Sequence, residues 1–257
     1  MLQRILGGAS VLALTAGLSN IAAAQPTTPQ QWSIITSTQI KPEYRMEYEA
    51  AQKEITAAYK KAGVSSRIVV QTIMGDLMEY TSIAPLAKYA DLDGPSPLVK
   101  ALGEAGSQRL LKKMGAYTNS IHRVTSLGIP DLSIMSPSAD IGDYVVVSVW
   151  RIYPGKGADF TAYMKDDYVP AMSKAGLANF WVSRPIFGGN LEERTTVRPL
   201  HKLAELDEGP LTTKALGAEK ARAMTMKQAK IVESVSYTVH RIRTDLSLMP
   251  APPPPSK

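Results

Sequence analysis

The sequence contains no cysteine and only three histidines among its 257 residues. The absence of cysteine excludes disulfide bonds, thiolate nucleophiles, zinc–thiolate sites and a lipid-modified N-terminal cysteine. The chain must therefore be held together by its hydrophobic core, and a hydrophobic content of 44% with 20% charged residues is ordinary for a globular protein. The length allows one large or two small domains.

Motifs of several common kinds of chemistry are also missing. The chain has no glycine-rich phosphate loop, no Gly-x-Ser-x-Gly elbow and no His-Glu-x-x-His zinc motif. Two acidic loops, at 91–94 and 205–209, lack the spacing of a calcium loop and are interpreted as helix N-terminal charges. The formal net charge of +6 is mild, and no run of lysine and arginine is dense enough for a nucleic-acid groove. Nucleotide cofactors, metal sites and nucleic-acid partners are therefore not indicated.

The N-terminus is typical of an export signal. A short basic start is followed by an apolar stretch at 5–21, and Ala22-Ala23-Ala24 offers a small-residue cleavage site. The apolar stretch is too interrupted by small polar residues for a membrane span, so no stable membrane anchor is predicted. We expect a signal peptide over 1–24 and a mature protein that is secreted or periplasmic, an environment that an exported chain without disulfides fits. Residues 25–31 are a polar linker, and 249–257, with five prolines, form a short tail.

The remaining chain repeats itself. Three short runs recur in the same order, at offsets of 113, 118 and 114 residues: 61–64 as 174–177, 121–124 as 239–242, and 131–133 as 245–247. A period of about a hundred residues indicates a duplicated domain, because solenoid repeats are far shorter. The sequence therefore predicts two repeats, at 32–135 and 143–248.

Hydrophobic periodicity predicts the same order of elements, β-α-β-β-α-β, in both repeats. The first repeat is predicted to have strands at 32–40, 67–74, 77–83 and 117–127 and helices at 43–62 and 98–114. The second is predicted to have strands at 144–153, 178–186, 191–199 and 233–243 and helices at 159–175 and 210–232. Pro170 lies inside one of these helices, where its missing N–H predicts a kink near Asp166 and Asp167.

This order is that of an α+β, ferredoxin-like unit, in which helices cover one face of the sheet. The other face of each sheet must be buried somewhere. Two tandem units can bury these faces by packing sheet to sheet as a pseudo-dimeric α/β barrel with four helices outside.

The two β-α-β-β-α-β patterns, together with the helix ending at 168–176, resemble the dimeric α/β-barrel superfamily in its fused, two-repeat form. That superfamily includes antibiotic-biosynthesis monooxygenase, EthD-like and NIPSNAP-like families, chlorite dismutases and haem-degrading enzymes. The resemblance covers almost all of the mature chain and implies the fold. It implies little about activity, because these families share a scaffold and little chemistry.

The last strand of each predicted repeat supplies the best candidate residues, His122 and His240. Ile121 and Val239 are expected to face the helices, so both histidines should point into the barrel. There they would serve as acid/base groups, as hydrogen-bond donors to a substrate or as a haem ligand. The alternative is a pair of half-buried strand histidines that are hydrogen-bonded within a hairpin and kept by the duplication.

Two further residues are candidates for ligand contact. Trp150 is assigned to the interior side of its strand, where it would either form an apolar wall against a flat ligand or fill the core. His201 has no counterpart in the first repeat, so it marks either the active half or a surface loop.

Three functions remain open from the sequence. The first is binding of a small organic molecule, with cofactor-independent oxygenase, isomerase or cyclase chemistry implied only by the resemblance. The second is haem binding or degradation, and the third is a non-catalytic envelope interaction module. The sequence decides neither the cofactor, nor the oligomeric state, nor whether the protein is an enzyme.

Overall fold

The computed structural model describes residues 31–136 and 141–249. The predicted signal peptide at 1–24 lies outside the described residues, as do nearly all of the linker and the proline-rich tail. Within the described part of the chain, no helix is long and apolar enough to cross a membrane.

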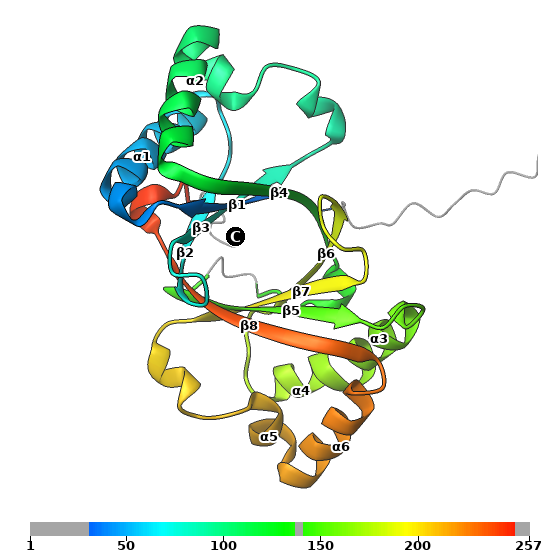
Figure 1. Cartoon of the computed structure of the whole chain (residues 1–257). Coiled ribbons are helices and arrows are strands. Elements are labelled where there is room, and N and C mark those ends of the chain that lie inside the picture. The colour runs from blue at the N-terminus through cyan, green and yellow to red at the C-terminus, as the bar shows by residue number, and fades with distance from the viewer. Residues whose placement is uncertain (1–30, 137–140, 250–257) are drawn as a thin grey trace, which may run out of the picture.

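Eight antiparallel strands close into one barrel, in the order β1-β3-β2-β8-β5-β7-β6-β4 (Figure 1). The strands are β1 (Trp32–Ile40), β2 (Ile68–Met74), β3 (Glu79–Leu86), β4 (Thr118–Gly128), β5 (Tyr144–Ile152), β6 (Trp181–Phe187), β7 (Glu193–Leu200) and β8 (Val232–Ile242). Two four-stranded sheets, one from each half of the chain, join edge to edge through β2–β8 and β4–β6. The predicted mixed α/β barrel is confirmed, and the sheets meet as one closed wall.

Helices lie on the two outer sides of the barrel (Figure 1). They are α1 (Arg45–Lys61), α2 (Pro97–Tyr117), α3 (Gly157–Tyr163), the π-helical turn η4 (Met164–Tyr168), α4 (Val169–Lys174), α5 (Leu211–Leu216) and α6 (Ala218–Gln228). Single 3-10 turns are η1 (Pro42–Tyr44), η2 (Tyr89–Leu92), η3 (Pro130–Leu132), η5 (Leu203–Leu206) and η6 (Thr244–Leu246).

Two predicted helices are less regular than their sequences indicated. The helix predicted over 210–232 is broken at Gly217, whose φ of 80° is left-handed, and Gly103 interrupts α2 with a φ of 70°. The irregularity predicted from Pro170 is present as the π-helical turn η4, directly before the proline. Because Pro170 has no N–H, the carbonyl of Asp166 cannot form the usual bond of an α-helix, and the wider turn accommodates this.

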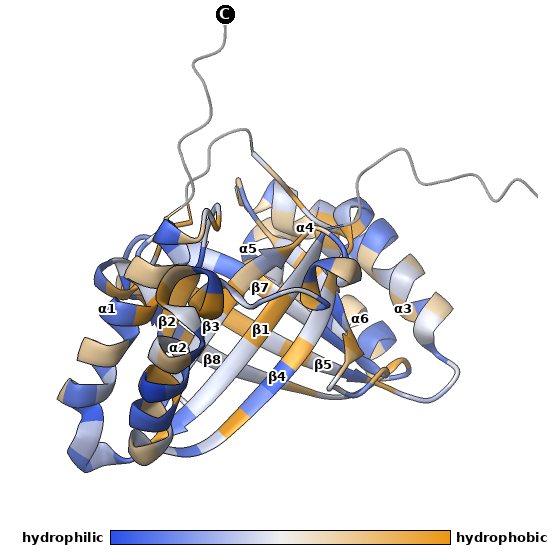
Figure 2. Ribbon diagram, turned by 90° about the horizontal axis from the view of Figure 1, so that it is seen from above, coloured by the Kyte–Doolittle hydropathy of each residue, from blue (hydrophilic) through white to orange (hydrophobic). Residues whose placement is uncertain are grey.

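The hydrophobic residues form three clusters. The first helix pair packs on the outer face of its sheet around Tyr48, and the second packs around Trp150 and Phe160. A third, smaller cluster of Val70, Val145 and Ile242 lies on the inner face of the barrel. Figure 2 shows the corresponding mixture of hydrophobic and hydrophilic residues along β1 and β4, as expected where neighbouring side chains point to opposite faces.

The end of each half of the chain crosses onto the other half. After β8, η6 places Leu246, which is fully buried, in the core of the first half, and after β4, η3 places Leu132 in the core of the second half. The two crossings use the same hydrogen bonds: Ser247 Oγ accepts from the Val69 backbone N–H at 2.8 Å, and Ser133 Oγ accepts from that of Val182 at 2.9 Å. We call residues 129–134 and 243–248 the exchanged segments.

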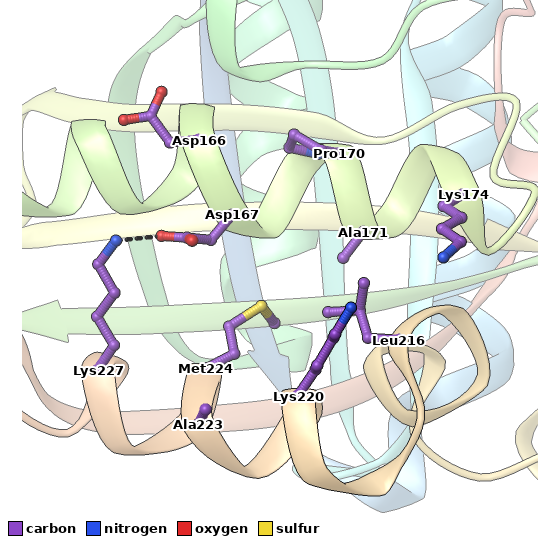
Figure 3. A pocket seen from close by; sticks show the side chains of 10 residues that line it. All are labelled: Asp166, Asp167, Pro170, Ala171, Lys174, Leu216, Lys220, Ala223, Met224 and Lys227. Atoms are coloured by element: carbon purple, nitrogen blue, oxygen red, sulfur yellow. Dashed lines mark hydrogen bonds and ion pairs between the residues drawn. The ribbon is translucent and has the colours of Figure 1, made fainter.

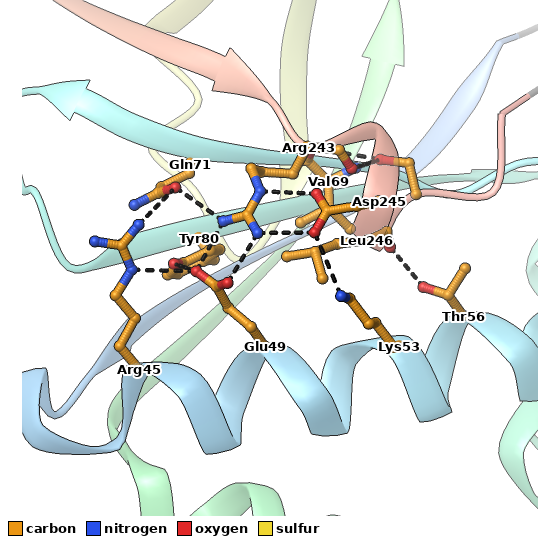
Figure 4. A network of polar contacts seen from close by, with 11 residues as sticks. Arg45, Glu49, Lys53, Thr56, Val69, Gln71, Tyr80, Arg243, Asp245 and Leu246 are labelled. Atoms are coloured by element: carbon orange, nitrogen blue, oxygen red, sulfur yellow. Dashed lines mark hydrogen bonds and ion pairs between the residues drawn. The ribbon is translucent and has the colours of Figure 1, made fainter.

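Charged side chains fix the exchanged segment 243–248 to α1 (Figure 4). Arg243 donates through Nη1 and Nη2 to the two carboxylate oxygens of Glu49 on α1, each at 2.8 Å, and through Nε to Asp245 at 2.9 Å. The hydrogen bonds that Glu49 accepts, from Arg243 first and then from Tyr80 and Arg45, lower its pKa to about 2. Position 129, which corresponds to Arg243 in the other exchanged segment, is an isoleucine and has no such contacts.

If the exchanged segments complete the two cores, truncating their buried leucines should be costly. Leu246→Ala should lower the free energy of unfolding by about 3 kcal/mol, because it leaves a cavity in a packed core. The exposed Leu191→Ala, which is 62% exposed, should change it by about 0.5 kcal/mol or less. Urea denaturation of both variants measures the difference, and an equal loss in the two would contradict the role given to η6.

Candidate functional site

The strand register decides which side chains face the barrel interior. Val145 pairs with His240 and Val147 with Thr238, so these four side chains share the inner face with the Val70 cluster. Many inner side chains are only half-buried, although the wall around them is closed: Ile35, Ser37, Thr81, Ile83, Val147 and Val197. Solvent therefore reaches parts of the inner face.

His240 is the most constrained polar group on the inner face. It is 5% exposed, and both ring nitrogens have threonine partners: Nδ1 lies 3.0 Å from Thr72 Oγ1 and Nε2 lies 2.8 Å from Thr238 Oγ1. Burial lowers the pKa of His240 to about 4. The imidazole is therefore neutral near neutral pH, so one hydroxyl donates to its bare nitrogen and the other accepts from its N–H.

A glycine next to the two threonines leaves room for their side chains. Gly75 follows an irregularity in the β2–β8 ladder between Thr72 and Met74, and its φ is 126°. A Cβ atom at Gly75 would lie 2.9 Å from Thr238 Cγ2 and 3.2 Å from Thr72 Cγ2. Any larger residue there would therefore press on both partners of His240. Sequence reasoning placed Thr238 on the interior side together with His240 but missed Thr72 and Gly75, since a Thr-x-His pair on one strand carries no recognised signature.

His122 lies on the inner side of β4, paired with Ser37, but it is exposed and makes no hydrogen bond within the described residues. The expectation that His122 and His240 occupy repeated positions is wrong. Both β4 and β8 have 11 residues, and each begins opposite the last residue of its neighbour, Thr118 opposite Ile40 and Val232 opposite Ile152.

His122 is thus the fifth residue of its strand and His240 the ninth, a displacement of about 13 Å along a strand. The true counterpart of His240 is Ser126, whose Oγ donates to the Arg184 carbonyl at 3.1 Å. Because the displacement is four residues, an even number, both histidines lie on the inner face although they do not occupy corresponding positions. Ile121, expected to pack under the helices, lies on the outer face but is 59% exposed.

Trp150 does not face the interior, which corrects the sequence assignment. It is 1% exposed on the outer face, in edge contact with Phe160 and Tyr168 at centroid distances of 5.8 and 5.2 Å. Its Nε1 donates to Thr196 Oγ1 at 3.1 Å, as core filler requires. His201 lies exposed beyond the end of β7, where its backbone N–H donates to Glu205 at 2.8 Å, in agreement with the surface-loop interpretation.

The two seams that close the barrel differ in polarity. At β2–β8 the inner face carries Thr72, Thr238 and His240, whereas the corresponding positions at β4–β6 are Pro185, Val124 and Ser126. The backbone arrangement is the same, so the polar group is not a requirement of barrel closure. The β2–β8 seam is therefore the candidate site, and we call Thr72, Thr238 and His240 the seam triad.

Two hollows lie outside the barrel, one on each half of the chain. One, of about 520 Å³, lies between α1 and α2, and the other, of about 430 Å³, lies between α4 and α6 (Figure 3). Corresponding ion pairs span them, Lys113 with Glu54 and Lys227 with Asp167. Exposed pairs of this kind contribute little stability. Since the same hollow recurs at the same place, neither one distinguishes a site.

The described residues offer poor ligation for haem at the seam triad. No group of three histidine or acidic residues that could hold a metal ion occurs in the described ranges. Both nitrogens of His240 are engaged by threonine hydroxyls, so an axial bond to iron would require Thr238 to move away. His122 has an uncommitted imidazole, but it stands exposed.

Comparisons with known proteins support the fold. No family model matches the sequence, and no curated protein matches it. A candidate monooxygenase from Lactobacillus acidophilus is 10% identical, with a TM-score of 0.57 over 88% of this chain and 98% of that one. An anthrone oxidase-like protein is 15% identical, with a TM-score of 0.59 over 84% and 92%.

A chlorite dismutase from Candidatus Nitrospira defluvii, in complex with imidazole, is 8% identical, with a TM-score of 0.53 over 84% of this chain and 92% of that one. At these identities the likeness shows the α/β-barrel fold alone.

The depressed pKa of His240 predicts a pH dependence of stability. Its folded pKa of about 4 lies below the unfolded value of 6.5, so the unfolded state binds more protons between these values. Stability should therefore fall by up to ~3 kcal/mol as pH decreases from about 6.5 to 4. His240→Gln should flatten this part of the curve, measured by urea denaturation at a series of pH values. Glu49, with a pKa of about 2, acts at lower pH, so an unchanged slope in His240→Gln would contradict the burial of a neutral imidazole.

Proposed function

We propose that the barrel interior binds a small, partly apolar organic molecule beside the seam triad. The observation that carries this proposal is the neutral, buried His240 held by two hydroxyls next to the apolar cluster of Val70, Val145 and Ile242. Ligand pockets combine an apolar lining with a few fixed polar groups in this way. The half-buried inner side chains support access for a ligand.

The geometry favours approach to Nε2 of His240. Thr72, on the Nδ1 side, is 2% exposed, whereas the Thr238 hydroxyl on the Nε2 side is only partly buried. A ligand hydroxyl or carbonyl would replace or join Thr238, while Thr72 would keep the ring orientation. Since a charged ligand would lose its hydration in this environment, we infer a neutral one.

Binding is better supported than catalysis. A general base works best with a pKa near the operating pH, and His240, at about 4, is a weak base. Oxygenase, isomerase or cyclase chemistry rests on the shared fold with proteins described as monooxygenase and anthrone oxidase-like. In such a reaction the seam triad would orient the substrate and hold it by hydrogen bonds.

We further propose that the two halves are tandem ferredoxin-like repeats of the antibiotic-biosynthesis monooxygenase, EthD or NIPSNAP type. Equal strand lengths, the same element order and the matching exchanged segments support this. Export is proposed from the signal-like residues 1–24, and N-terminal sequencing of the protein from its native host should find a start near Gln25. A start at Met1 would contradict it.

A neutral aromatic alcohol, 1-naphthol, tests the seam triad directly. The protein should bind it saturably, and His240→Ala and Thr238→Ala should each weaken binding about 10-fold, the value of one buried hydrogen bond. Gly75→Ala should weaken it while keeping all three polar groups, because its Cβ displaces both threonines. Fluorescence titration gives the dissociation constants.

Ser126→Ala, at the corresponding place in the other seam, is the matched control and should bind as the unaltered protein does. An equal loss in this control would contradict a site at the β2–β8 seam. If the unaltered protein does not bind at all, the non-catalytic envelope module becomes the better account.

Haem binding is the second candidate, because a chlorite dismutase shares the fold and His122 has an uncommitted imidazole. Titration with haemin should then give a shifted Soret band that is lost in His122→Ala and kept in His240→Ala. A spectrum equal to that of free haemin, or a band unaffected by both substitutions, would remove this candidate.

A further inference from the structure

Three polar side chains on the outer face of the second sheet have no hydrogen-bond or ion-pair partner within the described residues. Within the described residues, the side chains of Tyr168, Arg198 and Tyr237 make no hydrogen bond and no ion pair. Arg198 and Tyr168 are nevertheless half-buried. Tyr237 is 62% exposed, and no polar side-chain atom of the described residues is both buried and without a hydrogen bond, so the polar atoms of all three side chains reach solvent. A half-buried guanidinium that pairs with no carboxylate can bind an anion from solvent.

Register brings the three groups together. Arg198 on β7 pairs with Val146 on β5, and Tyr237 on β8 pairs with the adjacent outward residue of β5, Ser148. Tyr168 packs over the same face, with its ring centroid 5.2 Å from that of Trp150. Charge interactions couple its hydroxyl to both Arg198 and Tyr237.

The π-helical turn η4 is what places Tyr168 there. The buried helix residues Tyr48 and Phe160, at corresponding places in α1 and α3, are 112 residues apart, whereas the glycines that end the two helices, Gly63 and Gly176, are 113 apart. The second half therefore contains one extra helical residue, and the π-helical turn accommodates it. Such single-turn bulges are frequent at functional sites.

The first half lacks every part of this arrangement. Helix α1 has no π-helical turn, and the places of Tyr168, Arg198 and Tyr237 are taken by an isoleucine, an alanine and an arginine. An arginine on a strand can serve to discourage edge-to-edge pairing, but β7 is bonded on both sides within a closed barrel and has no free edge. Neither the duplicated scaffold nor protection of an edge accounts for Arg198.

The nearest carboxylates are committed elsewhere. Glu205 and Glu208 both act on the charge of Arg198, but Glu205 accepts the backbone N–H groups of His201 and Lys202, and Glu208 pairs with Lys214. Burial raises the pKa of Tyr168 well above its usual range, so its hydroxyl stays protonated and can donate. The cluster thus presents one positive charge and two hydroxyl donors.

We propose that Arg198, Tyr168 and Tyr237 form a second ligand site, separate from the barrel interior, for the carboxylate of a small organic monoanion. The planar guanidinium matches a carboxylate with two parallel hydrogen bonds. A single charge suits the site because one cation is available and two glutamates stand nearby. A phosphate dianion would carry an uncompensated charge and lose more hydration.

Benzoate and inorganic phosphate, titrated separately by calorimetry at pH 7, test this assignment. Benzoate should bind saturably and more tightly than phosphate. Arg198→Gln should weaken benzoate binding at least 10-fold, Arg198→Lys should weaken it less, and Tyr168→Phe should weaken it several-fold while leaving the thermal midpoint nearly unchanged. Arg123→Gln, at the place in the first half that corresponds to Tyr237, is the control and should bind benzoate normally.

Three results would overturn the proposal: no saturable benzoate binding by the unaltered protein, an equal loss in Arg123→Gln, or phosphate binding as tight as that of benzoate. His240→Ala should leave benzoate affinity unchanged. The benzoate titration therefore tests the second site separately from the seam triad, and one proposal can be contradicted while the other holds.

Discussion

The reciprocal crossing of the exchanged segments is the interaction on which the rest of the structure depends. Each half of the chain leaves the inner face of its sheet bare and its helix–sheet core short of one leucine. The backbone of Leu248 exchanges two hydrogen bonds with Arg67, both at 2.8 Å, and Ile134 does the same with Phe180 at 2.7 and 2.8 Å. These bonds extend the β2–β8 and β4–β6 seams, so closing the barrel and completing the two cores are one event.

Both proposed sites lie where the two halves differ on this common frame. Closure brings β8 beside β2 and so places His240 against Thr72, from opposite ends of the sequence. At the other seam the same closure leaves Ser126 with a single side-chain hydrogen bond, to the Arg184 carbonyl, and no histidine. On the outer face, the second half has one extra helical residue, in the π-helical turn that ends at Tyr168, and an arginine, Arg198, where the first half has an alanine. In each case the two halves share the backbone arrangement but not the polar side chains, which is why comparing the halves locates candidate sites in a chain without catalytic motifs.

The sequence predicted most helices and strands because each helix buries a regular stripe of hydrophobic residues and each strand alternates between residues of opposite faces. The barrel followed from the need to cover two bare sheet faces. The face assignment of β5 failed because both sides are apolar, with Val145 and Val147 inside and Trp150 and Ile152 outside, so alternation carried no information. The pairing of His122 with His240 was wrong because it relied on the similarity of 121–124 to 239–242. The offset of this match, 118 residues, differed from the offsets of the other two matches, 113 and 114 residues. Thr72 and Gly75 could not be predicted from the sequence, because they contact His240 and Thr238 only when β8 is paired with β2.

Hydrogen exchange in the intact protein tests the central claim most directly, at the backbone amides that cross between halves: Arg67, Val69, Ile129, Ile134, Phe180, Val182, Arg243 and Leu248. If the crossing holds the barrel shut, these amides should exchange only through global unfolding, with the same free energy as the central amides of β1 and β5. Exchange many-fold faster at these amides, with the strand centres still protected, would show that the exchanged segments fray locally and that the two halves stand without them.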